Sequence, residues 1–224
     1  MTQNRSMAVM ANRIDAPAAP DFFPTPPWAT RALCEHLARR GKRGMDFCWE
    51  PACGEGHMVR PLEEYFTWVS ASDIHDYGAG YEVRDFLDGG GLFGEAETRE
   101  TDWIITNPPF NRAADFALRG IGLARVGVAL LVRTAFLEGG ERYRNLFDLH
   151  PPEWILQFSE RVPMVKGRLD KKASSATAYC WIIWTHPGPS RPTLEPSLAW
   201  VPPGTRKRLE RPGDYLDERP NDAR

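Results

Sequence analysis

Between residues 21 and 186 the chain alternates short apolar runs with longer segments in which apolar residues recur every three or four positions. The short runs are rich in β-forming residues and are typical of strands, whereas the spaced pattern is typical of amphipathic helices. The runs predict strands at residues 46–50, 68–73, 81–84, 102–106, 126–132, 154–158 and 178–185. The spaced segments predict helices at residues 28–39, 57–65, 113–124 and 141–148.

This order of elements indicates one α/β domain at residues 21–186, built on an open sheet of seven strands with helices on both faces. The sheet is expected to be mostly parallel. No helix is expected between the last two strands, so the last strand should run antiparallel to its neighbours. The leader at 1–20 has no sustained period, and the tail at 187–224 is rich in Pro and charge. Neither end is expected to add a strand or a helix to the domain.

Composition narrows the possible settings of this domain. The 224 residues are 42% hydrophobic, which suffices for one sizeable core. The net charge of -2 gives no overall attraction to a polyanion, so such a partner would have to meet a local basic patch. With no long apolar run and no signal-peptide pattern, we expect a soluble cytoplasmic protein without a membrane partner. The four cysteines form no CxxC pair, which favours free thiols and no metal site; they are Cys34, Cys48, Cys53 and Cys180.

A glycine turn follows the first predicted strand in the segment EPACGEGHM. Gly54 and Gly56 permit a tight turn and the close approach of a ligand, and ligands of open α/β sheets gather at the carboxyl ends of strands. Taken alone, the turn could equally be a structural link. Asp73, however, ends the second strand 23 positions after Glu50, where an acidic group can hold a ribose diol. The pair of features therefore predicts an adenosine-type ligand.

The third predicted strand ends in Asp85 and Phe86. These residues suit the exocyclic amine and the face of a purine, although an ordinary turn is an alternative. The chain contains no GxxxxGK[ST] motif, which disfavours cleavage of a nucleoside triphosphate. Val59 stands where the dinucleotide fingerprint GxGxxG needs its third glycine.

The fourth predicted strand runs into Asn107-Pro108-Pro109-Phe110. Two prolines fix φ and lack N–H groups, so they make a stiff corner that offers acceptors. An amine bonded to the Asn107 side-chain oxygen and the Pro108 carbonyl would gain lone-pair density on its nitrogen and become able to attack a methyl group. Phe110 offers a surface on which an extruded base can stack. The alternative is a Pro-rich turn with a buried Phe.

The segments DFFPTP, EPACGEG and TNPPF, in this order, resemble the S-adenosylmethionine-dependent DNA adenine-N6 methyltransferases whose cofactor motifs precede the catalytic motif. The resemblance covers residues 21–110 in motif and reaches 185 in strand order. It implies a Rossmann-like class I methyltransferase fold and the cofactor S-adenosyl-L-methionine. The implied catalytic residues are Asn107, Pro108, Pro109 and Phe110. The implied cofactor-binding residues are Phe23, Thr25, Glu50, Ala52, Gly54, Asp73, Asp85 and Phe86.

Many members of that family carry a separate target-recognition domain, which this chain lacks space for after its last predicted strand. Nucleic-acid contacts are therefore expected in loops, chiefly the basic loop between the last two strands. The candidates are Arg133, Arg161, Lys166, Arg168, Lys171 and Lys172. A solvated charged loop is an equal alternative for the last five, and Arg133 with Thr134 could simply close a turn. A second basic stretch, TRKRLER, lies near the C-terminus.

The predicted reaction is methyl transfer to the N6 amine of adenine in DNA, by flipping the base or taking one already unpaired. Methylation of RNA adenine or of a protein glutamine remains open, since the corner can hold any planar amine. A non-catalytic DNA-binding protein on the same fold is the alternative from another class. A cytosine-C5 enzyme is disfavoured because no Pro-Cys pair stands at the catalytic corner. A compact enzyme of this kind resembles phage or prophage self-modification enzymes, and the oligomeric state stays open.

Overall fold

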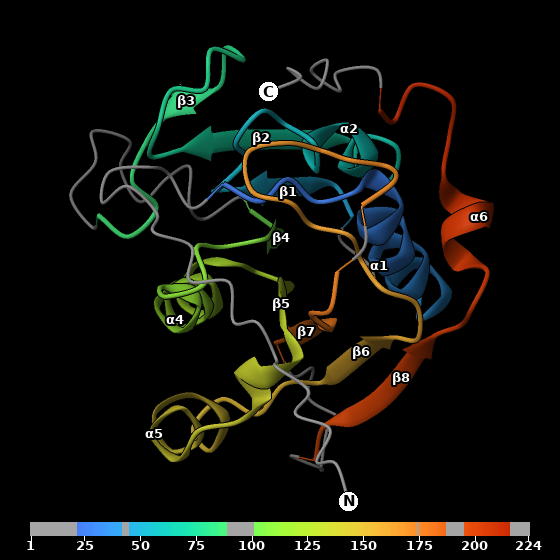
Figure 1. Ribbon diagram of the computed structural model, residues 1–224. Helices are drawn as coiled ribbons and strands as arrows, with labels where there is room; N and C mark the ends of the chain where they lie inside the picture. Colours follow the sequence, from blue (N-terminus) through green and yellow to red (C-terminus); the bar gives the residue numbers. More distant parts are fainter. Residues whose placement is uncertain (1–21, 42–44, 89–100, 174, 187–194, 216–224) are drawn as a thin grey trace, which may run out of the picture.

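The computed structural model of the protein describes residues 22–41, 45–88, 101–173, 175–186 and 195–215 (Figure 1). The predicted leader at 1–20 and parts of the predicted tail lie outside these residues. The strands are β1 (Phe47–Glu50), β2 (Trp68–Asp73), β3 (Glu82–Val83), β4 (Trp103–Thr106), β5 (Gly127–Arg133), β6 (Trp154–Phe158), β7 (Tyr179–Thr185) and β8 (Ser197–Val201). The helices are α1 (Pro27–Arg39), α2 (Val59–Leu62), α4 (Ala113–Leu123), α5 (Gly140–Arg142) and α6 (Thr205–Leu209), with a 3-10 turn η1 (Thr134–Leu137) and a π-helical turn η2 (Tyr143–Phe147).

The strands form a sheet of order β3-β2-β1-β4-β5-β7-β6-β8. Strands β1 to β5 pair in parallel, and β7 is antiparallel to both β5 and β6. Strand β6 consequently points the same way as β1 to β5. The expectation of a mostly parallel sheet with a reversed seventh strand is confirmed.

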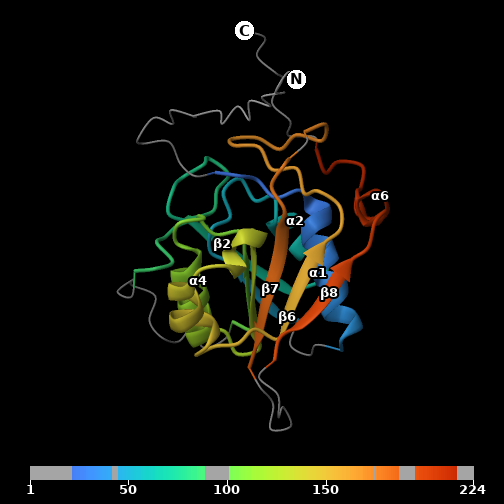
Figure 2. The ribbon, with the colours of Figure 1, turned by 60° about the horizontal axis from the view of Figure 1, so that its bottom comes forward.

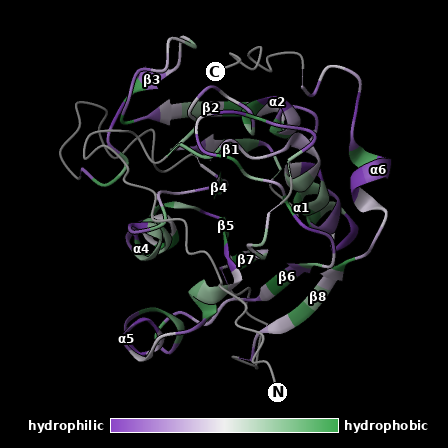
Figure 3. Cartoon of the chain, in the orientation of Figure 1, coloured by the Kyte–Doolittle hydropathy of each residue, from purple (hydrophilic) through white to green (hydrophobic). Residues whose placement is uncertain are grey.

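The expected number of strands was wrong, because the tail adds an eighth. Strand β8 pairs in parallel with β6 over its whole length, from Trp154 opposite Ser197 to Phe158 opposite Val201. In Figure 3, β8 carries green hydrophobic stretches, while α6 beyond it is largely purple. Val201 and Leu209 are buried in the main core and hold this last unit on the sheet. Prolines on both sides of β8 hid the strand from the sequence pattern.

Each face of the sheet packs against its own set of helices. Alternate residues of a strand point to opposite faces, so Trp103 and Ile105 of β4 join the core under α1, whereas Ile104 joins the core under α4. Figure 1 shows α1, α2 and α6 on one side of the sheet and α4 and α5 on the other. Helices on both faces are therefore confirmed, as is the α/β class.

A buried ion-pair cluster attaches the C-terminal segment to α1. Arg31 of α1 is 3% exposed. Its guanidinium donates to Glu64, to Asp214 at 2.7 and 2.8 Å, and to the Leu209 carbonyl at 2.8 Å. The cluster joins three segments that are far apart in the chain.

The carboxyl ends of the parallel strands meet at one edge of the sheet, which we call the carboxyl edge. Glu50, Asp73, Thr106 and Arg133 are the last residues of β1, β2, β4 and β5. The loop at 159–178, called here the β6–β7 loop, leaves and re-enters the sheet at the same edge, because Tyr179 pairs with Arg133. Figure 2 shows this loop above the strand ends.

Candidate functional site

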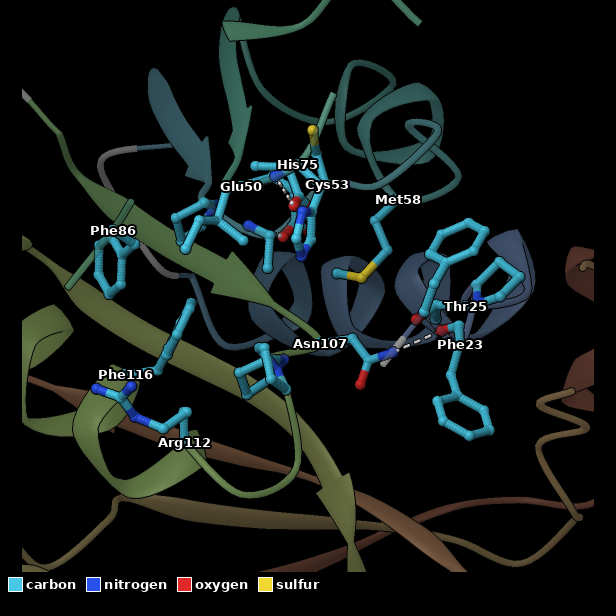
Figure 4. A pocket seen from close by; sticks show the side chains of 18 of the residues that line it. Phe23, Thr25, Glu50, Cys53, Met58, His75, Phe86, Asn107, Arg112 and Phe116 are labelled. Carbon is cyan, nitrogen blue, oxygen red and sulfur yellow. Dashed lines mark hydrogen bonds between the residues drawn. The ribbon is translucent and has the colours of Figure 1, made fainter. Parts of the chain in front are cut away.

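A cavity of about 370 Å³ opens at the carboxyl edge. Its walls come from the segment before α1, the glycine turn after β1, the ends of β2 and β3, the Asn-Pro-Pro-Phe corner after β4, and α4. Figure 4 shows Asn107 between two groups of side chains, with Phe86 and Phe116 on one side and Phe23 and Thr25 on the other. The volume lies in the range of about 300 to 1,000 Å³ typical of small-molecule sites.

Two carboxylates accept hydrogen bonds from the backbone of the glycine turn. The Glu50 Oε1 accepts the Ala52 N–H at 3.1 Å, and the Asp73 Oδ2 accepts the Gly54 N–H at 2.9 Å. Both glycines of the turn have positive φ, +54° at Gly54 and +84° at Gly56, which a residue with a Cβ rarely adopts. The backbone conformation at both positions therefore favours glycine, as the sequence predicted.

The group that approaches Gly54 is not the one expected. A Cβ on Gly54 would clash with the Phe22 ring, so this side chain occupies the space that the absent Cβ leaves. The cavity wall at the turn is formed by Pro51, Ala52 and Cys53, and Gly54 stands behind it. Gly54 thus serves the cavity through backbone shape and through its bond to Asp73.

Several buried oxygens on the cavity wall lack a hydrogen-bond partner among the residues described. Two of them are Thr25 Oγ1, on a residue 2% exposed, and Oε2 of the fully buried Glu50. Burial raises the pKa of Glu50 to about 8, because an ionised carboxylate loses its hydration there. A buried acceptor without a partner is costly. The wall is therefore suited to a ligand that brings N–H donors or positive charge.

The raised pKa of Glu50 predicts a pH-dependent stability. The carboxyl binds its proton more tightly in the folded chain than in the unfolded one, so its stabilising effect is lost as pH rises from about 4.3 through about 8. Glu50→Gln removes this titration. Over that window the wild-type free energy of unfolding should fall relative to the variant by up to about 1.4 kcal/mol per pH unit.

Urea unfolding of both ligand-free proteins between pH 5 and pH 9 measures this difference. Stability curves of wild type and Glu50→Gln that run parallel across the whole range would contradict the prediction. The wild-type protein with a bound cationic ligand is the informative control, since a positive charge beside the carboxyl should flatten its pH dependence.

At the ends of β2 and β3, the cavity wall combines two carboxylates with an aromatic ring. Asp73 Oδ1 accepts the His75 N–H at 3.0 Å, and Asp85 Oδ1 accepts the Leu87 N–H at 2.8 Å. Phe86 is 2% exposed and packs edge-on against Trp49, with ring centroids 5.2 Å apart. The acidic and aromatic residues predicted at the ends of β2 and β3 line the same cavity as the Asn-Pro-Pro-Phe corner.

The Asn-Pro-Pro-Phe corner holds the Asn107 amide in one orientation. Asn107 Nδ2 donates to the Phe23 carbonyl at 2.9 Å and contacts the Met164 sulfur at 3.7 Å. The other amide atom, Oδ1, is buried and has no partner in the described part of the chain. The Pro109 carbonyl accepts the Arg112 N–H at 2.9 Å, which closes the turn into α4. The corner therefore holds a buried acceptor without a partner on a residue of the cavity wall.

The stacking surface of Phe110 is framed by two elements. The ring of Phe23 lies 5.2 Å away, tilted by 45°, and the ring of Tyr179 lies 6.4 Å away. The Arg133 guanidinium carbon lies over the Phe110 ring, 4.0 Å from its centroid. Arg133 was expected at the same sheet edge as the corner, and the structure brings the two into contact.

The β6–β7 loop reaches back to the segment before α1. The Gly167 N–H donates to the Phe22 carbonyl at 2.8 Å, beside a short bridge between Val165 and Arg168. The remaining basic residues predicted for nucleic acid lie on this loop and not on the cavity wall: Arg161, Lys166, Arg168, Lys171 and Lys172. Arg168 pairs with Asp170 at 3.1 Å and Lys171 with Glu210 at 3.6 Å, so part of the charge of the loop is already matched.

Sequence reasoning missed several residues of the cavity wall, among them Phe22, His57, Met58, His75, Tyr77, Arg112 and Phe116. Most of them neighbour a predicted residue, so proximity in sequence was a usable signal. Met164, which contacts the Asn107 amide, gave no such signal, because it lies on the β6–β7 loop, 57 positions from Asn107 in the sequence.

The described residues contain no helix long and apolar enough to cross a membrane and no group of three or more potential metal ligands. All four cysteines are buried free thiols. Burial raises the pKa of the Cys53 thiol well above its ordinary value, so the thiol in the glycine turn stays protonated.

The parallel sheet with one reversed strand, the glycine turn and the edge cavity define an α/β methyltransferase-like fold. Solved structures with this fold include a type I restriction-modification methyltransferase subunit from Streptococcus thermophilus (TM-score 0.58, 12% identity, 79% of this chain, 46% of that one). A Pyrococcus horikoshii protein provisionally named an RNA methyltransferase aligns with TM-score 0.52 and 14% identity over 77% of this chain and 93% of its own. The Synechocystis magnesium protoporphyrin IX methyltransferase, solved with bound S-adenosylmethionine, aligns with TM-score 0.45 and 16% identity over 72% and 79% of the two chains.

The chain spans less than half of the Streptococcus subunit. No protein-family model matches the sequence, and no curated protein does.

Proposed function

We propose that the protein transfers a methyl group from S-adenosyl-L-methionine to the N6 amine of adenine in DNA. The observation that carries this proposal is the Asn107 amide. Its Nδ2 is held by the Phe23 carbonyl, and its buried Oδ1 is left without a partner beside the cavity. An acceptor held in this way suits a planar amine better than a hydroxyl or a carbon, because an amine has two hydrogens to donate.

The cavity wall fits the proposed cofactor. We expect its unpaired oxygens on Thr25 and Glu50 to receive the charged amino-acid end, and the Asp73 carboxylate, which is also on the wall, to hold the ribose. Ala52, Phe23, Asp85 and Phe86 complete a wall that passes from polar to apolar along the cavity. When bound, S-adenosylmethionine supplies a methyl group on a positively charged sulfur.

The residues of the corner then have defined tasks. Asn107 Oδ1 accepts one hydrogen of the adenine amine and the Pro108 carbonyl accepts the other, which orients the nitrogen lone pair toward the cavity. Phe110 stacks on the base, a contact worth about 1 to 3 kcal/mol. No covalent enzyme intermediate is required, in keeping with the buried, protonated Cys53 thiol.

DNA would meet the carboxyl edge of the sheet at the basic residues of the β6–β7 loop and at Arg133. The net charge of -2 makes a local patch necessary. Arg161, Arg168, Lys171 and Lys172 are exposed there and suited to phosphate contacts. Phage or prophage self-modification is the biological setting that we propose for this reaction.

The first test offers the purified protein S-adenosylmethionine with a labelled methyl group, together with unmethylated duplex DNA, single-stranded DNA, RNA or protein. The expected product is N6-methyladenine from DNA. Asn107→Ala should lose this product and keep cofactor affinity in calorimetry. Asn111→Ala, which removes an exposed amide four positions farther along the chain, should retain both.

The outcomes separate the remaining candidates. Label on RNA alone would keep the chemistry and replace the substrate, and label on glutamine would assign the corner to protein amides. A protein that binds DNA but transfers no label to any of these substrates would overturn the proposal in favour of a non-catalytic DNA-binding protein.

A further inference from the structure

Arg133 has no acidic partner in the described part of the chain, which sets it apart from two other arginines near the sheet. It is exposed, ends β5, and forms no ion pair with any residue that the structure describes. By contrast, Arg112 on the cavity wall is paired with Asp115 at 2.7 Å, and Arg125 before the other end of β5 lies 3.7 Å from Asp102. The charge of Arg133 is therefore available to a ligand.

The guanidinium nevertheless has a fixed place. Its central carbon lies 4.0 Å from the centroid of the Phe110 ring, and a stacking contact of this kind uses the flat face of the guanidinium. The five N–H donors point outward in the plane of the group, so stacking does not consume them. Arg133 can remain on Phe110 and still donate to an anion in the fork geometry that a phosphate accepts.

The proposed stacking of a base on Phe110 indicates which anion Arg133 would bind. A base that reaches this ring brings the phosphates of its own nucleotide with it, and these are the anions that cannot be separated from the substrate. A free nucleobase carries none. Arg133 is on β5 and Phe110 follows β4, the neighbouring strand, so a rigid pair of strands fixes the spacing between the ring and the guanidinium.

We propose that Arg133 binds a backbone phosphodiester flanking the target nucleotide and thereby positions the base on Phe110. This inference rests on the proposed function in taking the partner to be a nucleic acid and Phe110 to be the surface on which its target base stacks. Arg133 acts here as a positioning residue. Its contact is independent of base sequence, because a phosphate carries no sequence information.

The experiment measures binding of fluorescently labelled duplex and single-stranded oligonucleotides by anisotropy, without cofactor, at NaCl concentrations between 50 and 300 mM. Arg133→Met keeps an apolar side chain of similar length over Phe110 and removes the charge. Its dissociation constant should rise about 10- to 100-fold, and the slope of log K against log salt should become shallower by about one.

Two controls accompany it. Arg133→Lys keeps the charge without the planar fork, so its salt slope should stay close to that of wild type while affinity falls by a smaller factor. Arg144→Ala removes an exposed arginine of η2, outside the cavity, and should leave affinity unchanged.

Wild-type affinity and slope in Arg133→Met would overturn the inference. Weaker binding with an unchanged slope would also overturn it, since Arg133 would then only support the Phe110 ring. If Arg133→Met shows the expected shift while no N6-methyladenine forms, the phosphate contact stands and the proposed reaction fails. Absence of nucleic-acid binding by the wild-type protein would overturn both.

Discussion

Replacing Asn107 by Asp is expected to reduce adenine methylation by about 10²- to 10³-fold at pH 8, the size of effect seen when one aligned polar group of an active site is removed, and to restore part of it at lower pH. The native amide donates from Nδ2 to the Phe23 carbonyl at 2.9 Å. An ionised carboxylate has no hydrogen to donate there, so two acceptors would face each other.

A protonated carboxyl would reproduce the native arrangement. Its O–H donates to Phe23, and its carbonyl oxygen remains to accept the substrate amine. Partial burial and the facing carbonyl both raise the pKa of a carboxyl at this position, so the protonated form should become populated as pH falls below neutrality. The residual activity of Asn107→Asp should therefore increase toward low pH relative to wild type.

The measurement is the single-turnover rate of methyl transfer between pH 5.5 and pH 8.5 for wild type, Asn107→Asp and Asn107→Ala. The alanine variant can donate nothing at any pH and should show no relative gain. A pH profile of Asn107→Asp parallel to that of the alanine variant would contradict the positioning role of the Phe23 carbonyl, as would full activity at pH 8.

Replacing Arg31 by Ala is expected to lower the free energy of unfolding by about 3 to 5 kcal/mol. Arg31 is 3% exposed and holds Glu64 and Asp214 together. Without the guanidinium, the Asp214 carboxylate, whose side chain is 5% exposed, would stay buried beside the second carboxylate. Removing one partner of a buried charge group costs more than the group contributes as a whole, because it leaves a charge without compensation.

Urea unfolding of the variant measures this loss. Arg39→Ala is the matched control: its side chain is 67% exposed and pairs with Glu35 at 3.7 Å, so the loss should stay below about 1 kcal/mol. The combination of Arg31→Met with Asp214→Asn should be less destabilising than Arg31→Ala. Equal losses in Arg31→Ala and Arg39→Ala would show that the cluster contributes little.

Local patterns predicted most of the sheet because they depend on short-range periodicity. The seven expected strands all form, with ends within one residue of the expected positions. Helix α2 is shorter than predicted, Val59–Leu62 instead of 57–65, and it contains Pro61, which lacks a backbone donor. The eighth strand was missed because its pairing with β6 is a long-range contact between segments flanked by prolines.

The residues of the site, too, were predicted where a local pattern encodes them and missed where a long-range contact brings them together. The glycine turn, Asp73 and the corner are each encoded within a few residues, and the sheet topology brings them to one edge. The contacts of Phe22 with Gly54 and of Met164 with Asn107 join segments far apart in the chain, and no periodic pattern encodes such pairs. The ion pair of Lys171 with Glu210, which matches part of the charge of the basic loop, likewise joins segments far apart in the chain.

The two residues Phe22 and Phe23 have a consequence for the exchange of loops among related enzymes. The carbonyl of Phe22 bonds to the β6–β7 loop at Gly167, and the carbonyl of Phe23 orients the catalytic amide. A β6–β7 loop of another length would have to keep the Gly167 amide and the Met164 contact in register. Substitutions at exposed positions such as Arg168 and Lys172 are therefore expected to be tolerated better than a change of loop length.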